Sequence, residues 1–447
     1  MKKHKILLIL IALGLFAVLV AHVFSNPAEE TDRIYTNIYI HGVSVGGLTA
    51  EEANAALMER FQPELEARTI EYHAGGNPAV AFTFADFGAT YDFGNLISAA
   101  LNYANLRNLP QRLMRILGRA HNINEPALIQ ISPERMESIL CEISRKIDRP
   151  PVNASFVLEN GNINVIPEAQ GFGIDINHIT NATDEILNSQ HSGVVNITLL
   201  DFAPLFTTEN FQFDVSTLGA FQTTYTDSHD TPRMYNIRLA ADRINNQTVY
   251  PGGVFSAGAI IAANAQNSGY KSAIVLVRGE PVEDVGGGVC QVVTTLYNAV
   301  LAAELEIVQR HNHSSLVSYV EYGFDATVAG DYFDLKFRNN TEHPLLVTSE
   351  VTNGRLTVAI HGSESRPAER SIRFSTNRVD IISPGPYREI VDAAIPAGER
   401  HIILESQMGY KYELIKHVYI NGVEVETIVI NTSTYRALQG VVAIGAG

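Results

Sequence analysis

The alternation of apolar and polar residues predicts two amphipathic helices in the first half of the chain, over residues 49–61 and 132–147. Each begins at a residue type that caps helix N-termini well, Thr49 in the first and Ser132 in the second. Pro133 stands at the first helical position, where its missing N–H costs nothing.

These helices belong to a duplicated unit with the order helix, strand, turn, strand, helix. A shift of 83 residues brings Thr49 onto Ser132 and aligns an asparagine, a glycine and an aspartate without a gap. The second helix of each copy is expected over residues 95–104 and 179–188. We expect the repeated glycines to adopt positive φ angles and the aspartates to cap helices. The further aligned pairs are Asn77 and Asn160, Gly88 and Gly171, and Asp92 and Asp175.

The later part of the chain has a different pattern. Residues 215–365 combine glycine-rich turns with two short helical patterns, and from about Ser371 the residues alternate as in strands. Asn421-Gly422 is a strong signal for a hairpin turn. The predicted fold class is therefore α+β and multidomain, with a duplicated α/β region over 34–206, a mixed α+β domain and a small all-β domain over 371–447.

The N-terminus carries Lys2, Lys3 and Lys5 before an uncharged apolar run from Ile6 to Phe24. Such a run is long enough to cross a hydrocarbon core of about 30 Å as a helix. The lysines would stay inside, and the bulk of the chain would lie outside the cytoplasm. We expect residues 1–26 to form a single-pass signal anchor in the cell membrane; a cleaved signal peptide is the alternative.

Composition narrows the classes of function. The chain has 447 residues, a formal net charge of -16 and two cysteines. An acidic chain suits neither DNA nor RNA, whose binding depends on neutralising phosphates, so no nucleic-acid partner is expected. Two thiols cannot staple several domains. Cys141 lies at the edge of an apolar helical stripe and is expected to pack there.

The candidate chemistry centres on Gly286-Gly287-Gly288-Val289-Cys290-Gln291. An apolar stripe from Val289 onward predicts a helix, so Cys290 would lie in its first turn. There the helix dipole lowers the pKa of a thiol, and a glycine loop of this kind positions nucleophiles in many thiol enzymes.

Downstream, His311 and His313 are two apart, so on a strand both imidazoles would share a face; either is a candidate base. Asp325 is a candidate to orient one of them, which would complete a thiol-hydrolase arrangement. The alternatives stay open: binding without chemistry, a buried structural cysteine, or a zinc site formed by these groups with Cys290. No cofactor is indicated.

Candidate binding residues are the glycines Gly286, Gly287 and Gly288, together with Gln291 and two arginines. Arg238 and Arg338 have the bidentate geometry that holds a carboxylate such as the end of a stem peptide. A surface ion pair is the alternative role for each.

The segment over 215–365 resembles the VanW family, which is named for a protein of glycopeptide-resistance clusters. The resemblance implies an envelope domain and no particular reaction. Three positions depart from the family pattern: Tyr235 stands where histidine is frequent, Val293 where serine is frequent, and Glu304 where glycine is frequent. The matching blocks are Tyr235–Ala241, Pro251–Ser256, Gly269–Tyr270, Gly286–Val292, Thr294–Val300, Glu306–His311, Asp325–Val328 and Lys336–Asn340.

Two further resemblances flank this domain. The duplicated region is similar to a YoaR-like peptidoglycan-binding domain, and the tail from Gly409 to Gly445 is similar to a five-glycine (G5) domain. Both imply adhesion to peptidoglycan or another envelope polymer. The first functional hypothesis is a membrane-anchored envelope protein that binds peptidoglycan. The second is a thiol-dependent peptidoglycan-modifying enzyme, and a zinc-dependent envelope hydrolase is the third.

Overall fold

The computed structural model describes residues 32–103, 118–225, 232–261, 269–277, 280–330 and 332–446, and a few residues between 11 and 21. The expected membrane segment over 6–24 lies largely outside these residues. Within the described part of the chain, no helix is both long enough and apolar enough to span a bilayer.

The chain forms two compact units, and the mixed α+β multidomain class is confirmed. Unit 1 comprises Met1–Pro151 and Gln170–Ala203, and unit 2 comprises Val152–Ala169 and Pro204–Gly447. The chain therefore passes between the units three times. Residues 152–169, which the repeat assigns to the duplicated region, pack as part of unit 2.

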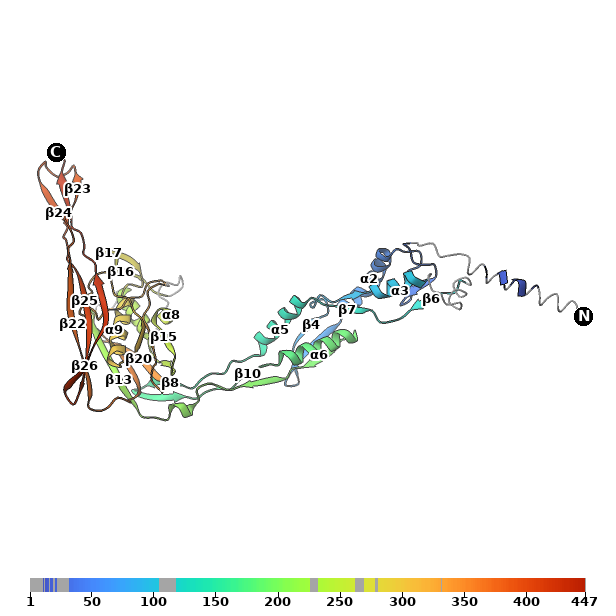
Figure 1. The fold of residues 1–447 in the computed structure, drawn as a ribbon, viewed down its shortest axis with the longest axis horizontal. Helices are drawn as coiled ribbons and strands as arrows, with labels where there is room; N and C mark the ends of the chain where they lie inside the picture. Colours follow the sequence, from blue (N-terminus) through green and yellow to red (C-terminus); the bar gives the residue numbers. More distant parts are fainter. Residues whose placement is uncertain are drawn as a thin grey trace, which may run out of the picture. The chain divides into compact units, whose positions relative to one another are not determined.

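Unit 1 contains most of the duplicated elements, including the four helices labelled α2, α3, α5 and α6 in Figure 1. Helices α2 and α5 begin after the predicted capping residues, whereas α6 begins at Ile176, earlier than the predicted residue 179. Thr49 and Glu52 form a reciprocal capping box at the start of α2, and Ser132 accepts from the Arg135 N–H at the start of α5. Asp175 caps α6 by accepting from the His178 N–H. The helices are α2 (Ala50–Glu66), α3 (Gly94–Asn102), α5 (Pro133–Ile147) and α6 (Ile176–Ser189).

Two hydrophobic clusters fill unit 1. One lies between α2, α3 and the β2-β1-β6 sheet; the other lies between α5, α6 and the β11-β3-β4 sheet. In the latter sheet β11, from the second copy, pairs in parallel with β3 from the first, so the copies share one sheet. The strands are β1 (Ile38–Ile40), β2 (Val43–Ser44), β3 (Thr69–Ala74), β4 (Asn77–Thr83), β5 (Thr90–Asp92), β6 (His121–Ile123), β7 (Leu128–Gln130), β10 (Gly171–Ile174), β11 (Gly193–Asn196) and β12 (Leu199–Phe202).

Two expectations for unit 1 are wrong in part. Gly88 has φ 65°, as predicted, but Gly171 does not have a positive φ. Gly171 instead lies so close to Pro151 that a side chain would collide with its backbone. Cys141 is exposed on α5 rather than packed, because the buried face of this helix is formed by residues such as Ile139 and Ile143. Both cysteines are free.

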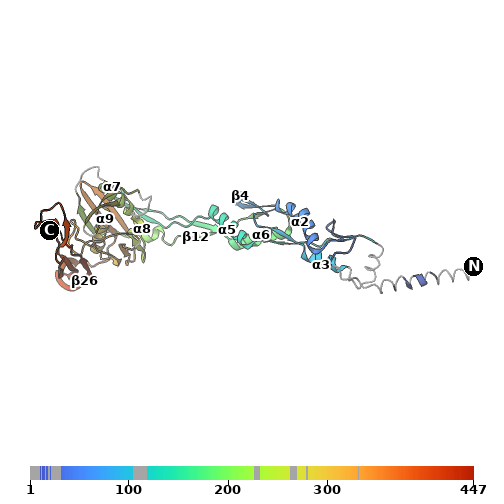
Figure 2. The same cartoon turned by 90° about the horizontal axis from the view of Figure 1, so that it is seen from above.

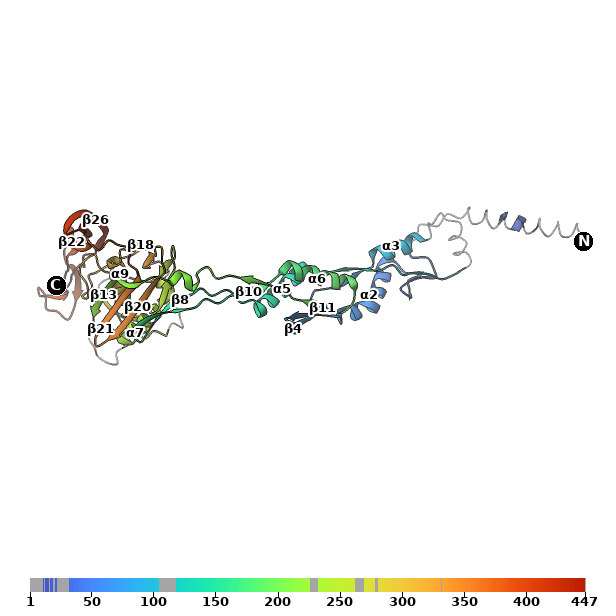
Figure 3. The ribbon, with the colours of Figure 1, turned by 90° about the horizontal axis from the view of Figure 1, so that it is seen from below.

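Unit 2 is built around α9 (Val289–Ala302), a helix that is apolar and buried on nearly all sides. It packs on the antiparallel β13-β21-β20-β14 sheet, whose neighbouring strands β13, β20 and β21 are visible in Figure 3. The alternation of buried and exposed residues along β21 places one face of this sheet against α9. The strands are β13 (Val215–Thr224), β14 (Gln247–Val249), β20 (Leu345–Thr352) and β21 (Arg355–Ser363).

Smaller elements complete the surroundings of α9. Helix α7 (Pro232–Ile244) packs against α9 and the sheet, and α8 (Ala257–Ile261) packs against α7 (Figure 2). The β16–β17 hairpin packs beside α7. The strands are β15 (Val254–Ser256), β16 (Ser272–Val277), β17 (Glu280–Val285), β18 (Glu306–Gln309) and β19 (Lys336–Arg338).

The β8–β9 hairpin in unit 2 comes from the duplicated sequence. Phe156 of β8 packs edge-on against Phe211 of the short helix η2, with ring centroids 4.6 Å apart, and both join a cluster with Leu346. Backbone N–H groups of β8 donate to the side chains of Thr248 and Asn246. The bounds are β8 (Ser155–Glu159), β9 (Asn162–Ile166) and η2 (Thr208–Phe211).

The C-terminal part of unit 2 is all-β, as expected. The long strands β22, β25 and β26 form one antiparallel sheet, and Figure 1 shows them next to α9. Asn421 and Gly422 both have positive φ and join β25 to β26 in the predicted hairpin. The strands are β22 (Arg370–Ile382), β23 (Arg388–Asp392), β24 (Arg400–Leu404), β25 (Gly409–Ile420), β26 (Val423–Tyr435) and β27 (Val441–Gly445).

Glu304 explains one departure from the family pattern. It follows the end of α9 with φ 57°, a left-handed conformation that glycine adopts without strain. Its carboxylate pairs with Arg370 at 2.7 Å and with Lys416 at 3.2 Å, both from the β-rich tail. Glutamate at this position is less comfortable than glycine in the left-handed conformation, but its carboxylate forms ion pairs that connect the end of α9 to β22 and β25.

Candidate functional site

Three consecutive glycines build the start of α9. Gly286 and Gly288 have φ angles of 86° and 106°, which side chains rarely adopt. Gly287 packs so closely on β16 that an added Cβ would lie 2.9 Å from the Cβ of Ala273. The buried amide of Asn236 donates to the Gly287 carbonyl at 3.0 Å and fixes the loop to α7. The glycine run therefore determines where α9 begins.

The loop delivers Cys290 to the first turn of α9, as the sequence predicts. The half-buried sulfur lies 3.3 Å from Oγ1 of Thr327 and 3.7 Å from the carbonyl oxygen of Val328. The segment carrying Thr327 is held on α9 because Ala326 exchanges two hydrogen bonds with the Thr294 hydroxyl. The dipole and free N–H groups of a first turn favour an anion, so this position suits a thiolate.

Asp325 is buried beside the segment that carries His313. Its carboxylate accepts from the His313 backbone N–H at 2.6 Å, from His313 Nδ1 at 2.8 Å, from Arg310 at 3.1 Å and from the Tyr435 hydroxyl at 2.6 Å. Burial raises the pKa of Asp325, but the His313 hydrogen bond and the Arg310 charge outweigh it and leave that pKa below its ordinary value. The carboxylate is therefore ionised and held in one orientation.

His313 connects Asp325 to Cys290. Because Nδ1 faces Asp325, the other ring nitrogen is left to interact with Cys290, and each of the two side chains shifts the pKa of the other. Burial lowers the pKa of His313, but its bonds to Asp325 and Cys290 prevail and raise that pKa to about 9. Burial raises the pKa of Cys290, and the hydrogen bond and charge of His313 overcome it and lower that pKa to about 7.

A thiolate beside an imidazolium is an activated nucleophile with its acid already in place. The chain order of cysteine, histidine and aspartate is the order that the sequence predicts. The expectation that His313 and Asp325 lie on strands is wrong, since β18 ends at Gln309 and both residues lie in irregular segments. The arrangement can attack a carbonyl carbon and protonate the leaving group.

The side chain of His311 makes other contacts. Its ring packs against Phe333, with centroids 4.8 Å apart, and its Nε2 lies 3.2 Å from the side-chain nitrogen of Gln309. The prediction that both histidines share a strand face is therefore wrong. The predicted zinc ligands do not surround one point, and no metal-binding group of His, Cys, Asp and Glu side chains occurs among the described residues.

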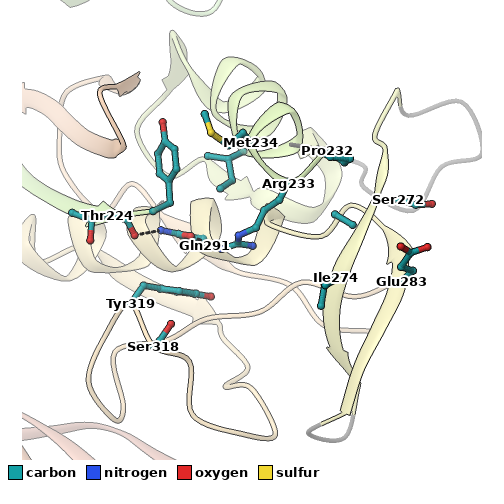
Figure 4. A pocket seen from close by; sticks show the side chains of 13 residues that line it. Thr224, Pro232, Arg233, Met234, Ser272, Ile274, Glu283, Gln291, Ser318 and Tyr319 are labelled. Carbon is teal, nitrogen blue, oxygen red and sulfur yellow. Dashed lines mark hydrogen bonds between the residues drawn. The ribbon is translucent and has the colours of Figure 1, made fainter. Parts of the chain in front are cut away.

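A cavity of about 750 Å3 adjoins the start of α9. Gln291 and Tyr319 line it, and the charge of Cys290 adds to burial in raising the pKa of Tyr319, so the cavity lies close to the sulfur. Figure 4 shows Arg233 extending from α7 into this space toward Gln291. The lining residues are Thr224, Tyr225, Pro232, Arg233, Met234, Ile237, Ser272, Ala273, Ile274, Glu283, Gln291, Ser318 and Tyr319.

The sequence analysis missed Arg233 and named two other arginines. Arg238 is exposed on α7, and Arg338 pairs with Glu306 at 3.1 Å on the surface; neither lines the cavity. Arg233 stands four residues before the buried Ile237, on the face that α7 turns toward α9. A charged residue in register with an apolar helix face is the signal that could have identified it.

Tyr235, where the family often has histidine, has its ring 4.2 Å from the Lys271 ammonium. It contributes neither to the cysteine site nor to the lining of the cavity.

Comparisons with known proteins divide the chain in two. A family model described as "VanW like protein" matches residues 232–361, which include the whole constellation. A second model, described as "Putative peptidoglycan binding domain", matches residues 80–196.

Two curated relatives are similar to parts of the chain. The protein YoaR of Bacillus subtilis (strain 168) is 30% identical over 240 residues, which are 54% of this chain and 78% of YoaR. The vancomycin B-type resistance protein VanW of Enterococcus faecalis (strain ATCC 700802 / V583) is 30% identical over 116 residues, 25% of this chain and 42% of VanW.

Two solved structures are similar to part of the chain. The IgA1 protease G5 domain structure is 21% identical, with a TM-score of 0.14, and the match covers 18% of this chain and 95% of that one. The crystal structure of HP0197-G5 is 18% identical, with a TM-score of 0.12, and the match covers 17% of this chain and all 100% of that one.

Proposed function

The chain belongs to the VanW-like family, together with YoaR, and on this premise we propose that it is a thiol-dependent enzyme that modifies peptidoglycan peptides. It is a cell-wall-associated protein. One observation carries the catalytic proposal: a single imidazole, His313, is hydrogen-bonded to the buried Asp325 and interacts with Cys290 at a helix start, where it lowers the pKa of the thiol.

The proposed reaction is acyl transfer through a thioester. The Cys290 thiolate attacks the carbonyl carbon of an amide, a C–S bond forms and the carbonyl electrons move to oxygen. When they return, the C–N bond breaks and His313 donates its proton to the leaving amine. Water or an acceptor amine then attacks the thioester, gives a proton to His313 and releases the thiolate. Asp325 holds the ring throughout and stabilises its charged form.

The rest of the chain places this reaction in the envelope. The duplicated region of unit 1 binds peptidoglycan, and the β-rich tail is a G5-like module that adheres to envelope polymer. The apolar segment over 6–24 anchors the protein in the membrane with its bulk outside the cytoplasm. Peptidoglycan is thus brought to unit 2 by affinity rather than by diffusion alone, which raises its effective concentration at Cys290.

The test uses the purified full chain with digested peptidoglycan fragments, and the products are followed by mass spectrometry. Wild type releases or exchanges a peptide, and Cys290→Ala abolishes this product. Cys141→Ala is the matched control, because it removes the other, exposed thiol and leaves product formation unchanged.

A second measurement separates binding from chemistry. Both variants are expected to co-sediment with peptidoglycan as wild type does, since Cys290 lies in unit 2 and Cys141→Ala removes only one sulfur atom from the surface of α5. Should wild type bind the wall and yield no Cys290-dependent product, the catalytic proposal fails and unit 2 is a binding module.

A further inference from the structure

The cavity beside α9 contains a cation, Arg233, with which no acidic side chain among the described residues forms an ion pair. Arg233 extends into it from α7, as Figure 4 shows. Within the part of the chain that the structure describes, no carboxylate forms an ion pair with this guanidinium, although the cavity is partly enclosed by protein. A half-buried cation normally pairs with an anion, so its environment indicates a ligand that supplies one.

The side chain of Arg233 is held in a defined position. Its Nη2 donates to Oε1 of the buried Gln291 at 2.6 Å. Gln291 is fixed in turn, because its Nε2 donates to the Thr223 hydroxyl at 3.1 Å and to the Thr224 carbonyl at 3.0 Å. Gln291 therefore acts as a rigid mount that holds the guanidinium in one place and leaves the rest of its planar fork directed to the cavity.

Gln291, which holds Arg233, lies beside the proposed nucleophile Cys290. Gln291 follows Cys290 in the same helical turn, and Tyr319 closes the cavity on the side where it also contacts Thr294, one turn further along α9. An anion bound to Arg233 would therefore lie near the Cys290 sulfur. A group held by Arg233 would therefore belong to a part of the substrate near the bond under attack.

The other polar groups that line the cavity indicate which class of anion could bind to Arg233. Glu283 lines the same space, and its negative charge disfavours multiply charged anions such as phosphate esters. A single carboxylate fits the planar guanidinium fork, and a neighbouring amide or amine suits Glu283, Ser318 and Ser272. These are the groups of a peptide C-terminus.

We propose that Arg233, mounted on Gln291, binds the free C-terminal carboxylate of a peptide and so directs Cys290 to the bond next to the terminal residue. This inference rests on the proposed thiol chemistry for its consequence, but the binding site is testable without it. The protein would be exo-acting: it would take peptides with a free terminal carboxylate and reject internal or capped ends.

The experiment measures binding to the full chain carrying Cys290→Ala, so that no turnover interferes. The probes are acetyl-L-lysyl-D-alanyl-D-alanine and its C-terminal amide, titrated by calorimetry. The acid should bind about 10- to 100-fold more tightly than the amide, the range expected for hydrogen bonds to a charged group. Adding Arg233→Gln should remove this preference.

Arg238→Gln in the same background is the matched control, because Arg238 is exposed on the same helix and does not line the cavity. It should preserve the preference for the acid. Circular dichroism and thermal unfolding establish that each variant is folded, and Arg233→Lys, which keeps the charge, should retain part of the preference if folding is intact.

Two results would overturn the inference: equal affinity for acid and amide, or a preference that survives Arg233→Gln. Failure of the proposed function is distinct, since it would show as a preserved, Arg233-dependent preference with no Cys290-dependent turnover of the acid by the otherwise wild-type chain.

Discussion

At the scale of single residues, the pKa values of Cys290 and His313 depend on each other. Neither side chain alone would be reactive, since burial raises the pKa of the thiol and lowers the pKa of the imidazole. Their mutual contact reverses both effects, and Asp325 adds to the reversal by stabilising the protonated ring. The site is thus an ion pair whose two pKa values belong to the pair rather than to either member.

The ion pair predicts a bell-shaped pH dependence for acyl transfer. The thiolate forms as pH rises through about 7, and the imidazolium that protonates the leaving amine is lost as pH rises through about 9. The rate constant kcat/KM should therefore rise on the first limb and fall on the second. A single limb rising near the ordinary pKa of a thiol would contradict the pairing.

The first limb can be measured without a substrate. In the Cys141→Ser background, alkylation of Cys290 by iodoacetamide should reach half its maximal rate near pH 7. His313→Ala should move that midpoint upward by more than a unit, because burial then acts on the thiol unopposed. An unchanged midpoint in His313→Ala would show that the helix start alone activates the sulfur.

Sequence reasoning placed Cys290 in the first turn of α9 because glycine runs and helix periodicity are local signals, and it proposed His313 and Asp325 from residue type and spacing. It missed Arg233 and Tyr435, and it grouped His311 with the site. Whether a side chain faces a cavity depends on which faces of α7 and α9 meet, which is a property of tertiary packing. The contact between Tyr435 and Asp325 joins residues 110 positions apart, which no local pattern specifies.

Among the elements, the loop before α9 is the most constrained. Gly288 combines φ 106° with close contact to α7, where an added Cβ would lie 3.0 Å from the Arg233 carbonyl oxygen. Gly252 also has a positive φ of 73° but has open space around it. A comparison of Gly288 with Gly252 therefore distinguishes the cost of a side chain at positive φ from the cost of steric crowding.

Gly288→Ala is therefore expected to destabilise unit 2 by more than Gly252→Ala. Each substitution incurs the cost of a side chain at positive φ, roughly 1 kcal/mol or more, and Gly288→Ala adds displacement of α7 or α9. Urea denaturation of the two variants measures the difference. Equal losses of unfolding free energy would mean that the loop can move without disturbing α7.

Elements with strong caps were predictable, and their assembly was not. Thr49 and Ser132 fix the starts of α2 and α5 from neighbouring residues alone. The two copies of the repeat then diverge, because the β3–β4 hairpin stays in unit 1 while the β8–β9 hairpin packs on Phe211 in unit 2. A repeat in sequence specifies the local hairpin but not the surface on which it docks.

At the scale of the whole molecule, the β-rich tail is part of the cysteine site. Tyr435, at the end of β26, donates its hydroxyl proton to Asp325 at 2.6 Å and accepts from the Gly323 N–H at 2.7 Å. Arg310, the other partner of Asp325, donates to Ser433 on the same strand at 2.7 Å. The orientation of His313 thus depends on a strand that lies outside the VanW-like match.

Tyr435→Phe should weaken this connection. The loss of one hydrogen bond to a buried carboxylate is expected to cost about 1 to 3 kcal/mol of stability. It should also raise the alkylation midpoint of Cys290, because a less firmly held Asp325 supports the His313 cation less well. Tyr412→Phe is the control. Tyr412 lies on β25, where its ring stacks on that of Tyr322, and its hydroxyl is not among the groups that donate to Asp325. A purely structural role would lower stability and leave the midpoint unmoved.

The passage of the chain between units predicts which fragments fold. A fragment beginning at Pro204 lacks the β8–β9 hairpin and uncovers Phe211 and Leu346. It should be less stable, by roughly the 2 to 3 kcal/mol that burying one phenylalanine contributes, than a fragment in which residues 152–169 are joined to Pro204 by a Gly-Ser linker. Thermal unfolding compares the two, and equal midpoints would show that the hairpin is dispensable.

That hairpin also has a consequence for how the protein is made. Phe156 leaves the ribosome long before Leu346, the residue that helps to cover it. At synthesis rates of about 5–20 residues per second, the wait is on the order of ten seconds or more. For most of this interval, after Ala203 has been made, the new chain carries an aromatic strand that Leu346 does not yet cover, beside a first unit whose residues are complete. A chaperone that shields such strands would therefore act on this segment first, and its removal would be felt as aggregation of half-finished chains.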